Sequence, residues 1–189
     1  MPNYLVSVDP GVRACGVAIW AQVADERMPP DAKPGVLHGA GYVRNPLTRG
    51  QDTEAACAMG RAVGSFIALA VGSGHHRLEL VIECPRVYDA AFQKGDQNTS
   101  IIPLSLVVGA VGMCQPFWKV TQYFPRDWKG TADADRVVIP LVQSRVKDFE
   151  RARVQLPAES LAHNVWDGIG VGLKLLGRLE PHRVFHREP

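Results

Sequence analysis

The segment from Tyr4 to Trp20 constrains the fold of this chain more than any other. It reads YLVSVDPGVRACGVAIW, an apolar run that ends in Asp9, a Pro-Gly turn and a second apolar run. The first run predicts a buried strand, and Val12 to Trp20 predicts an antiparallel partner folding back on it. A carboxylate that ends a buried strand must be solvated, paired or bound to a cation. Asp9 is therefore either a turn former or a ligand at the mouth of a sheet.

Glu83 repeats this arrangement later in the chain. It follows the apolar run Leu78 to Ile82, which predicts a short strand. Before that strand, apolar residues recur at intervals of three and four between Asp52 and Gly72, which predicts a helix. A strand reached through a helix normally lies parallel to its neighbour, so the carboxyl ends of both strands meet at one edge. We therefore expect Asp9 and Glu83 to converge.

A third acid, Asp167, lies in the last predicted element. This element begins near Ala158 and carries apolar residues at helical spacing up to Leu176. It also contains three glycines, at 168, 170 and 172, and each destabilises a helix by about 1 kcal/mol relative to alanine. A helix with these glycines must gain from close packing on the sheet, which would bring Asp167 near the other acids. A glycine-interrupted strand is the alternative.

The remaining segments complete an alternation of strands and helices. They predict a strand over Gly35–Arg44, a loop over Arg86–Thr99, a helix over Ser100–Cys114 with Pro103 in its first turn, a strand over Phe117–Phe124, a turn over Pro125–Gly130, and a helix over Val138–Glu150 with Phe149 inside and a basic outer side. This order predicts an α/β sheet of mixed direction. We expect one domain over residues 1–180 and a basic tail over 181–189.

Composition excludes several classes of protein. The 189 residues are 46% hydrophobic and 21% charged, as in soluble globular domains. No apolar run reaches the roughly 20 residues that span a bilayer, and the start lacks an export signal, so we expect a cytoplasmic protein with no membrane partner. The four cysteines are isolated, which favours reduced core thiols. A net charge of +2 does not by itself indicate nucleic acid.

Four segments together resemble a known family. They are DPGVRACG at Asp9, IEC at Glu83, the turn PRDWKG, and HNVWDGIGVG around Asp167. In this order they resemble the RuvC-like Holliday junction resolvases of the RNase H-like superfamily, and the stretch VYDAAFQKGDQN is similar to phage-type members. The resemblance implies an RNase H-like α/β fold with a five-stranded mixed sheet, antiparallel hairpin strands plus parallel strands, flanked by helices.

The same resemblance implies a function. It predicts a homodimeric, magnesium-dependent endodeoxyribonuclease of DNA recombination and repair. This enzyme would resolve four-way (Holliday) junctions by symmetric paired nicks. It would act in a bacterial cell or a phage-infected host. Asp9 would bridge two ions, Glu83 would hold one and Asp167 the other, with Mn²⁺ able to replace Mg²⁺. The chemistry suits such acids, because two divalent ions activate a water and stabilise the leaving oxygen. Hard carboxylate oxygens are the ligands that Mg²⁺ prefers.

The chain departs from this family beside Asp167. Relatives carry a second ligand, Asp or His, three positions earlier, where this chain has Asn164 with His163 one step further back. On a helix both positions flank Asp167, so either side chain could reach the same ion. His163 could act as a ligand or a proton-transfer group, and Asn164 as an oxygen ligand or an orienting group.

Basic and aromatic side chains near the acids are candidates for DNA contact. Phosphates would be contacted by Arg13, Arg86, Lys94, Arg126 and Lys129, and exposed bases would stack on Tyr88 and Phe92. Three alternatives stay open: a related nuclease acting on flaps, branched DNA or RNA; a junction-binding protein without catalysis; and a phosphotransfer fold related to sugar kinases. The last expects a second nucleotide-binding half, which 189 residues cannot hold.

Overall fold

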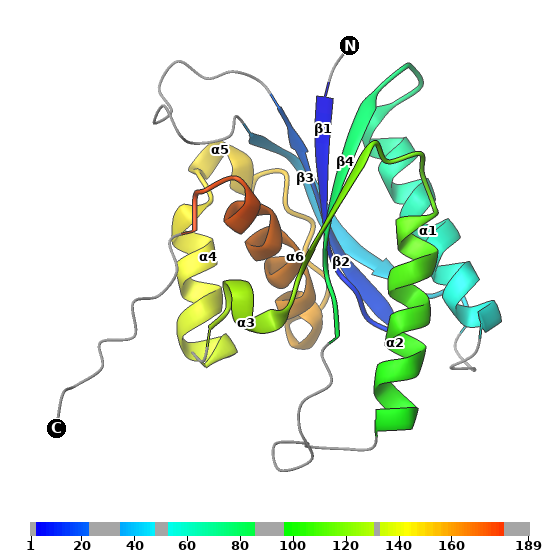
Figure 1. Cartoon of the computed structure of the whole chain (residues 1–189). Coiled ribbons are helices and arrows are strands. Elements are labelled where there is room, and N and C mark those ends of the chain that lie inside the picture. Colours follow the sequence, from blue (N-terminus) through cyan, green and yellow to red (C-terminus); the bar gives the residue numbers. More distant parts are fainter. Residues whose placement is uncertain (1–2, 23–34, 48–52, 86–96, 131–132, 180–189) are drawn as a thin grey trace, which may run out of the picture.

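A five-stranded mixed sheet forms the centre of the protein (Figure 1). The computed structural model describes residues 3–22, 35–47, 53–85, 97–130 and 133–179. The strands are β1 (Asn3–Asp9), β2 (Ala14–Ala21), β3 (Val36–Arg44), β4 (Arg77–Glu83) and β5 (Lys119–Tyr123), in the order β3-β2-β1-β4-β5. The pairs β1–β2 and β2–β3 are antiparallel, whereas β1–β4 and β4–β5 are parallel. The predicted mixed sheet and its opening hairpin are confirmed.

Helices cover both faces of the sheet (Figure 1). On one face lie α1 (Thr53–Val71) and α2 (Gln97–Gly112). On the other lie α3 (Pro125–Trp128), α4 (Ile139–Arg145), α5 (Asp148–Arg151) and α6 (Ala162–Leu175), with a π-helical turn at Ala134–Val138 and a 3₁₀ turn at Glu159–Leu161. The last predicted element is therefore a helix and not a glycine-interrupted strand.

The alternation of side chains along the strands decides which residues face α6. In β1, Val6 and Val8 belong to the core under α1 and α2, whereas Leu5 belongs to the core under α6. In β4, Ile82 faces α1 and α2, and Val81 faces the other side. Because side chains alternate along a strand, the acids that end β1 and β4 also point toward the α6 side.

The helix α1 is long and apolar enough to cross a membrane by length and composition, the one such helix in the described ranges. Its buried residues include Met59, Val63 and Ile67, which pack in the core against β1, β2 and β4. One face of α1 thus serves the core of this domain, as in the amphipathic helices of globular proteins.

Several sequence predictions need correction at the ends of elements. The helix α2 begins at Gln97, so the predicted loop does not extend to Thr99 and Pro103 lies inside the helix, beyond its first turn. The turn over Pro125–Gly130 contains the short helix α3. Not every cysteine is a core thiol, because Cys57 is exposed on α1. Helix ends are set by capping contacts that periodicity does not encode.

The predicted helix over Val138–Glu150 is in fact two helices, α4 and α5. The chain is extended at Val146, with ψ 121°, and Phe149 is 52% exposed instead of buried. The break follows from Glu150, whose fully buried carboxylate accepts a hydrogen bond from the Lys147 amide at 2.9 Å. The Glu150 side chain thus caps the start of α5 and fixes where this second helix begins.

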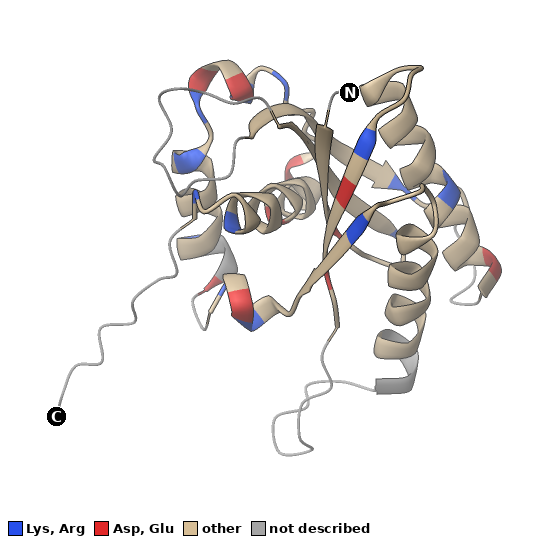
Figure 2. Ribbon diagram, turned by 45° about the horizontal axis from the view of Figure 1, so that its top comes forward, with Lys and Arg blue, Asp and Glu red and all other residues tan. Residues whose placement is uncertain are grey.

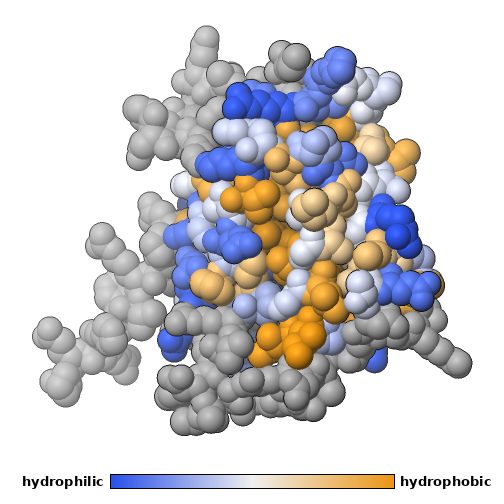
Figure 3. Space-filling view, turned by 45° about the vertical axis from the view of Figure 1, so that its right-hand side comes forward, coloured by the Kyte–Doolittle hydropathy of each residue, from blue (hydrophilic) through white to orange (hydrophobic). Residues whose placement is uncertain are grey.

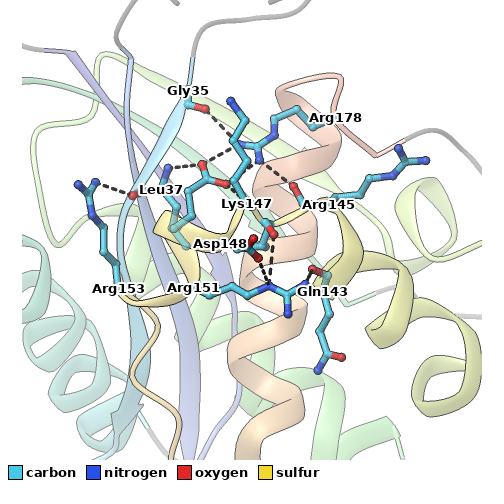
Figure 4. A network of polar contacts seen from close by, with 11 residues as sticks. Gly35, Leu37, Gln143, Arg145, Lys147, Asp148, Arg151, Arg153 and Arg178 are labelled. Carbon is cyan, nitrogen blue, oxygen red and sulfur yellow. Dashed lines mark hydrogen bonds and ion pairs between the residues drawn. The ribbon is translucent and has the colours of Figure 1, made fainter.

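A polar network lies along the outer edge of β3 (Figure 4). Glu150 is bonded to three of its labelled residues, Leu37, Lys147 and Arg178. Its Oε1 accepts from the Leu37 amide at 2.9 Å, and its Oε2 pairs with the Arg178 guanidinium at 2.7 Å. Further along, the Ala40 amide donates to the Arg153 carbonyl at 3.1 Å. Edge strands with free amides invite wrong pairing, and this network occupies the amides of Leu37 and Ala40.

Candidate active site

Three acids from separate segments gather at the carboxyl edge of β1 and β4. Asp9 is the last residue of β1, Glu83 is the last residue of β4, and Asp167 lies in the second turn of α6. The parallel pairing of β1 with β4 carries both strand ends to the same edge. This group, Asp9, Glu83 and Asp167, is called the acid cluster below.

Close contact between two glycines brings Asp167 beside Asp9. The hairpin register pairs Asp9 with Gly16, and α6 crosses β2 at this point. A Cβ atom at Gly168 would lie 2.6 Å from the Gly16 carbonyl oxygen, and a side chain at Gly16 would collide with the Asn164 carbonyl. Only glycine permits this approach of helix to strand. The helical glycines thus gain from packing on the sheet, as the sequence predicts.

Parallel pairing also delivers α3 to the acid cluster. Glu83 pairs with Tyr123 at the end of β5, so the chain leaving β5 starts beside the acid. Pro125 occupies the first turn of α3, where its missing N–H costs nothing. The Asp127 side chain accepts a hydrogen bond from the Phe124 amide at 2.8 Å, which fixes the start of this helix.

The end of α3 places a cation and an indole against the acid cluster. The Lys129 Nζ lies 2.8 Å from Asp167 Oδ2 and 3.4 Å from Glu83 Oε2. The Trp128 Nε1 donates a hydrogen bond to the same Glu83 oxygen at 2.6 Å. Both contacts are largely buried, so they are screened less than surface pairs. Lys129 therefore bridges two of the three acids.

The acid cluster perturbs its own proton equilibria. Burial raises the pKa of Asp9 well above its usual range, the charges of Glu83 and Asp167 raise it further, and Lys129 opposes them. Burial also raises the pKa of Glu83, although Lys129 and the Trp128 N–H lower it. For Lys129, burial would lower the pKa, but the three carboxylates outweigh it and the pKa rises. One ammonium is therefore too little positive charge for three acids.

The donor set of the acid cluster fits a hard divalent cation. Three carboxylates supply oxygen ligands, and Asp167 Oδ1 is buried without a hydrogen-bond partner among the described atoms. Within the described ranges, however, no three His, Cys, Asp or Glu side chains are already arranged to hold an ion. Lys129 stands where a cation would neutralise Glu83 and Asp167, so ion binding would require this ammonium to move.

Arg13, His163 and Asn164 line a second part of the same edge. They border a cavity of about 500 Å³ between the β1–β2 turn, which follows Asp9, and the first turn of α6. His163 is exposed and Asn164 is half-buried. The structure thus brings together these three predicted residues, in a cavity open to solvent next to the acid cluster.

The other predicted DNA contacts divide into two groups. Arg126 is exposed on α3, beside the acid cluster. Four of the predicted residues fall outside the described ranges: Arg86, Tyr88, Phe92 and Lys94. Figure 2 shows basic residues dispersed over several elements of the described chain. Arg151 on α5 binds the Gln143 carbonyl at 2.8 Å, which is a structural contact.

Sequence reasoning missed Trp128 and assigned Lys129 only to phosphate. A signal was present, because the PRDWKG turn directly follows the predicted strand Phe117–Phe124, which the structure pairs with the strand ending in Glu83. An indole N–H and an ammonium are both hydrogen-bond donors, so either can bind a carboxylate that ends a neighbouring strand. The order of the residues in a short helix, which decides where each side chain points, could not be read from the turn alone.

No model of a protein family matches the chain, and no curated protein matches its sequence. Its fold, however, is that of the RNase H-like Holliday junction resolvases. RuvC of Thermus thermophilus is similar with a TM-score of 0.54 and 13% identity, over 94% of this chain and 99% of that one. T. thermophilus RuvC in complex with Holliday junction substrate gives 0.54 and 17%, over 90% of each chain.

The yeast mitochondrial Holliday junction resolvase Ydc2 has the same fold. Its TM-score is 0.55 at 7% identity, over 93% of this chain and 79% of that one. Identities this low establish a shared fold and not a shared activity. The fold expected from the RuvC-like resemblance is confirmed.

Proposed function

We propose that this protein is a metal-dependent endonuclease that resolves four-way DNA junctions. The observation that carries the proposal is the acid cluster, three carboxylates at the carboxyl edge of a resolvase-type sheet with Lys129 as their internal counter-cation. One fold neighbour, Ydc2, is a Holliday junction resolvase, and another is RuvC in complex with Holliday junction substrate. Function resides in the site, so the acids and not the fold carry the assignment.

The residues of the acid cluster have distinct tasks in this proposal. Asp9, Glu83 and Asp167 would hold two Mg²⁺ or Mn²⁺ ions, which supply an activated water and a stabilised leaving oxygen when bound. Lys129 balances the charge of Glu83 and Asp167 in the free protein and offers a positive group to an arriving phosphate. The cavity holding Arg13 lies next to Asp9 and can receive the DNA backbone on that side.

His163 and Asn164 are the remaining candidates for an extra ligand. Both border the cavity beside Asp9, and only an imidazole titrates near neutral pH. If His163 takes part, His163→Ala lowers the nicking rate about tenfold or more and changes its pH profile. Asn164→Ala then does less, and the reverse ranking transfers the role to Asn164.

A homodimer would supply the two active sites that paired nicks require, because a four-way junction has two-fold symmetry. The helix α2 exposes Ile102 and Leu106, the turn after it exposes Met113, and β5 exposes Val120. Figure 3 shows a hydrophobic band along this face of the molecule. An apolar face of this kind is typical of protein interfaces, so we place the dimer contact here.

The decisive experiment compares DNA substrates. Labelled four-way junction, flap, RNA–DNA hybrid and linear duplex are incubated with the protein, with Mg²⁺ and with chelator. We expect symmetric nicks in the junction that require the ion. Preferred cutting of the flap or hybrid would assign a related nuclease, and tight junction binding without nicks in Mg²⁺ or Mn²⁺ would assign a binding protein.

A further inference from the structure

Trp128 links the helix that carries Asp167 to the carboxylate of Glu83. It is 5% exposed, and its indole Nε1 donates to Glu83 Oε2 at 2.6 Å. An indole has one N–H and no acceptor, so this contact selects one oxygen of the carboxylate. The bond is charge-assisted and lies in a desolvated place, where such bonds are strongest.

The Trp128 indole packs against α6 at Gly170, where the helix has no side chain. A Cβ atom at Gly170 would lie 2.9 Å from Cη2 of the Trp128 ring and 3.0 Å from a Val142 methyl group. The ring therefore occupies the space that a larger side chain on α6 would take. A mid-helix glycine destabilises by about 1 kcal/mol relative to alanine, so this one is compensated by the ring that packs on it. Packing on one side leaves the N–H pointing at Glu83 on the other.

We propose that Trp128 is a positioning residue for Glu83. Its indole N–H holds the Glu83 carboxylate in one orientation toward Asp9 and Asp167. The inference rests on the proposed function, because Glu83 is a ligand only if the protein binds divalent ions. Trp128 contacts the ligand and not the reacting atoms. Groups that orient metal ligands in this way change metal affinity and rate although they touch no substrate.

Trp20 offers a matched control inside the same fold. It is fully buried, and its Nε1 donates to Ser7 Oγ at 2.9 Å. It also packs on a glycine of α6, since a Cβ atom at Gly172 would lie 2.7 Å from its Cε2. The two tryptophans thus share burial, a satisfied N–H and a glycine socket. They differ in the acceptor, which is a core hydroxyl for Trp20 and a carboxylate of the acid cluster for Trp128.

The contact itself is tested by NMR of the indole N–H groups in the full chain, which has four tryptophans. Glu83→Ala removes the acceptor, so we expect the Trp128 signal to move and to exchange faster with solvent. The Trp20 signal stays in place. An unmoved Trp128 signal would show that the indole does not hold Glu83, and would overturn the inference whatever the protein's activity.

The positioning role is tested by Trp128→Phe and Trp20→Phe. Trp128→Phe should weaken Mn²⁺ binding to the metal-free protein, measured by calorimetry, about tenfold and lower kcat for nicking with little change in KM. Trp20→Phe should lower Tm but leave Mn²⁺ affinity and kcat unchanged. Gly170→Ala, which displaces the Trp128 ring, should reproduce the loss, and Gly172→Ala should not.

Two results would contradict this role and have different meanings. Equal losses in the two tryptophan variants would make Trp128 a core residue only, while the proposed function stands. A wild-type protein that neither binds Mn²⁺ nor nicks junctions would remove the proposed function, and the positioning role with it. The NMR measurement reports on the contact in both cases.

Discussion

Lys129 decides how the acid cluster behaves in the free protein. Its ammonium contacts Glu83 and Asp167, and its side chain is 18% exposed. Lys129→Met keeps most of the aliphatic stem but leaves the acids without a counter-charge. We expect the free energy of unfolding of the metal-free protein to fall by about 2 kcal/mol, since breaking a largely buried pair is costly. Thermal melts should show Tm lower by about 4 to 8 °C.

Added Mg²⁺ should raise Tm more in Lys129→Met than in the wild type, because the ion then replaces the missing charge without competition. Lys119→Met is the control. Lys119 pairs with the largely buried Glu79 at 3.0 Å, outside the acid cluster, so its loss should leave the gain in Tm from Mg²⁺ as in the wild type. Equal Mg²⁺-dependent gains in all three proteins would show that Lys129 and the ion do not share a site.

Asp9 is an acid whose charge is disfavoured in the folded protein. Its pKa is raised well above the usual range, first by burial and then by the neighbouring acids. The folded state therefore holds a proton there more tightly than the unfolded chain does. Wild-type stability then falls as pH rises through the raised pKa. We expect metal-free Asp9→Asn to melt above the wild type at neutral pH, and the difference to shrink as pH falls.

The same variant should no longer nick junctions, yet bind them as well as or more tightly than the wild type. Neutralising one acid removes a ligand and also reduces repulsion of the phosphate. Glu83→Gln and Asp167→Asn should share this loss of nicking, measured beside gel shifts. Asp148→Asn, a fully exposed acid on α5, is the control and should nick normally. Folded variants of the acid cluster that still cut would remove these residues from the mechanism.

At the scale of elements, Glu150 joins α5 to β3 and to Arg178, which follows α6. Its burial would raise its pKa, but hydrogen bonds from Arg178 and the amides of Leu37 and Lys147 lower it overall. The stability from this group is therefore present above the ordinary carboxyl pKa and is lost as pH falls through the lowered one.

Glu150→Gln should lower the free energy of unfolding by about 3 to 5 kcal/mol at neutral pH, because Arg178 keeps a buried charge without its partner. Denaturant melts against pH should show the gap to the wild type closing in acid. Glu159→Gln changes an exposed acid in the 3₁₀ turn and should have no such effect. A gap that does not depend on pH would mean that Glu150 acts through packing and not through its charge.

Periodicity predicts the long elements of this fold well. The alternation in β1 and β4 and the spacing in α6 are local patterns, so the strands, the final helix and the convergence of three acids follow from them. The break between α4 and α5 does not follow, because it depends on contacts of Glu150 with Leu37 and Arg178, which lie 113 and 28 positions away along the chain. Trp128 was missed for the same reason, since its acceptor lies on another strand.

At the scale of the whole molecule, the proposed function and the proposed dimer would connect the apolar face of α2 and β5 to the outcome of cleavage. The acid cluster lies at the carboxyl edge of the sheet, and each chain contains one. Two nicks at symmetric positions in one junction then need two chains bound together. A protein that acts as a monomer would cut one strand and dissociate before the second cut.

Ile102→Glu should therefore separate the two cuts. Ile102 is 55% exposed on α2, and a charge in an apolar interface is left without a partner when the dimer forms. We expect this variant to sediment as a monomer in analytical ultracentrifugation while its Tm changes little. On a supercoiled plasmid with an extruded cruciform, the wild type should give linear product, and the variant should give nicked circles.

The control is Leu69→Glu, which places the same charge at a leucine that is 85% exposed on α1, away from this face. Linear product from a monomeric Ile102→Glu would show that paired cutting does not require the dimer, whereas a dimeric Ile102→Glu would move the interface away from α2.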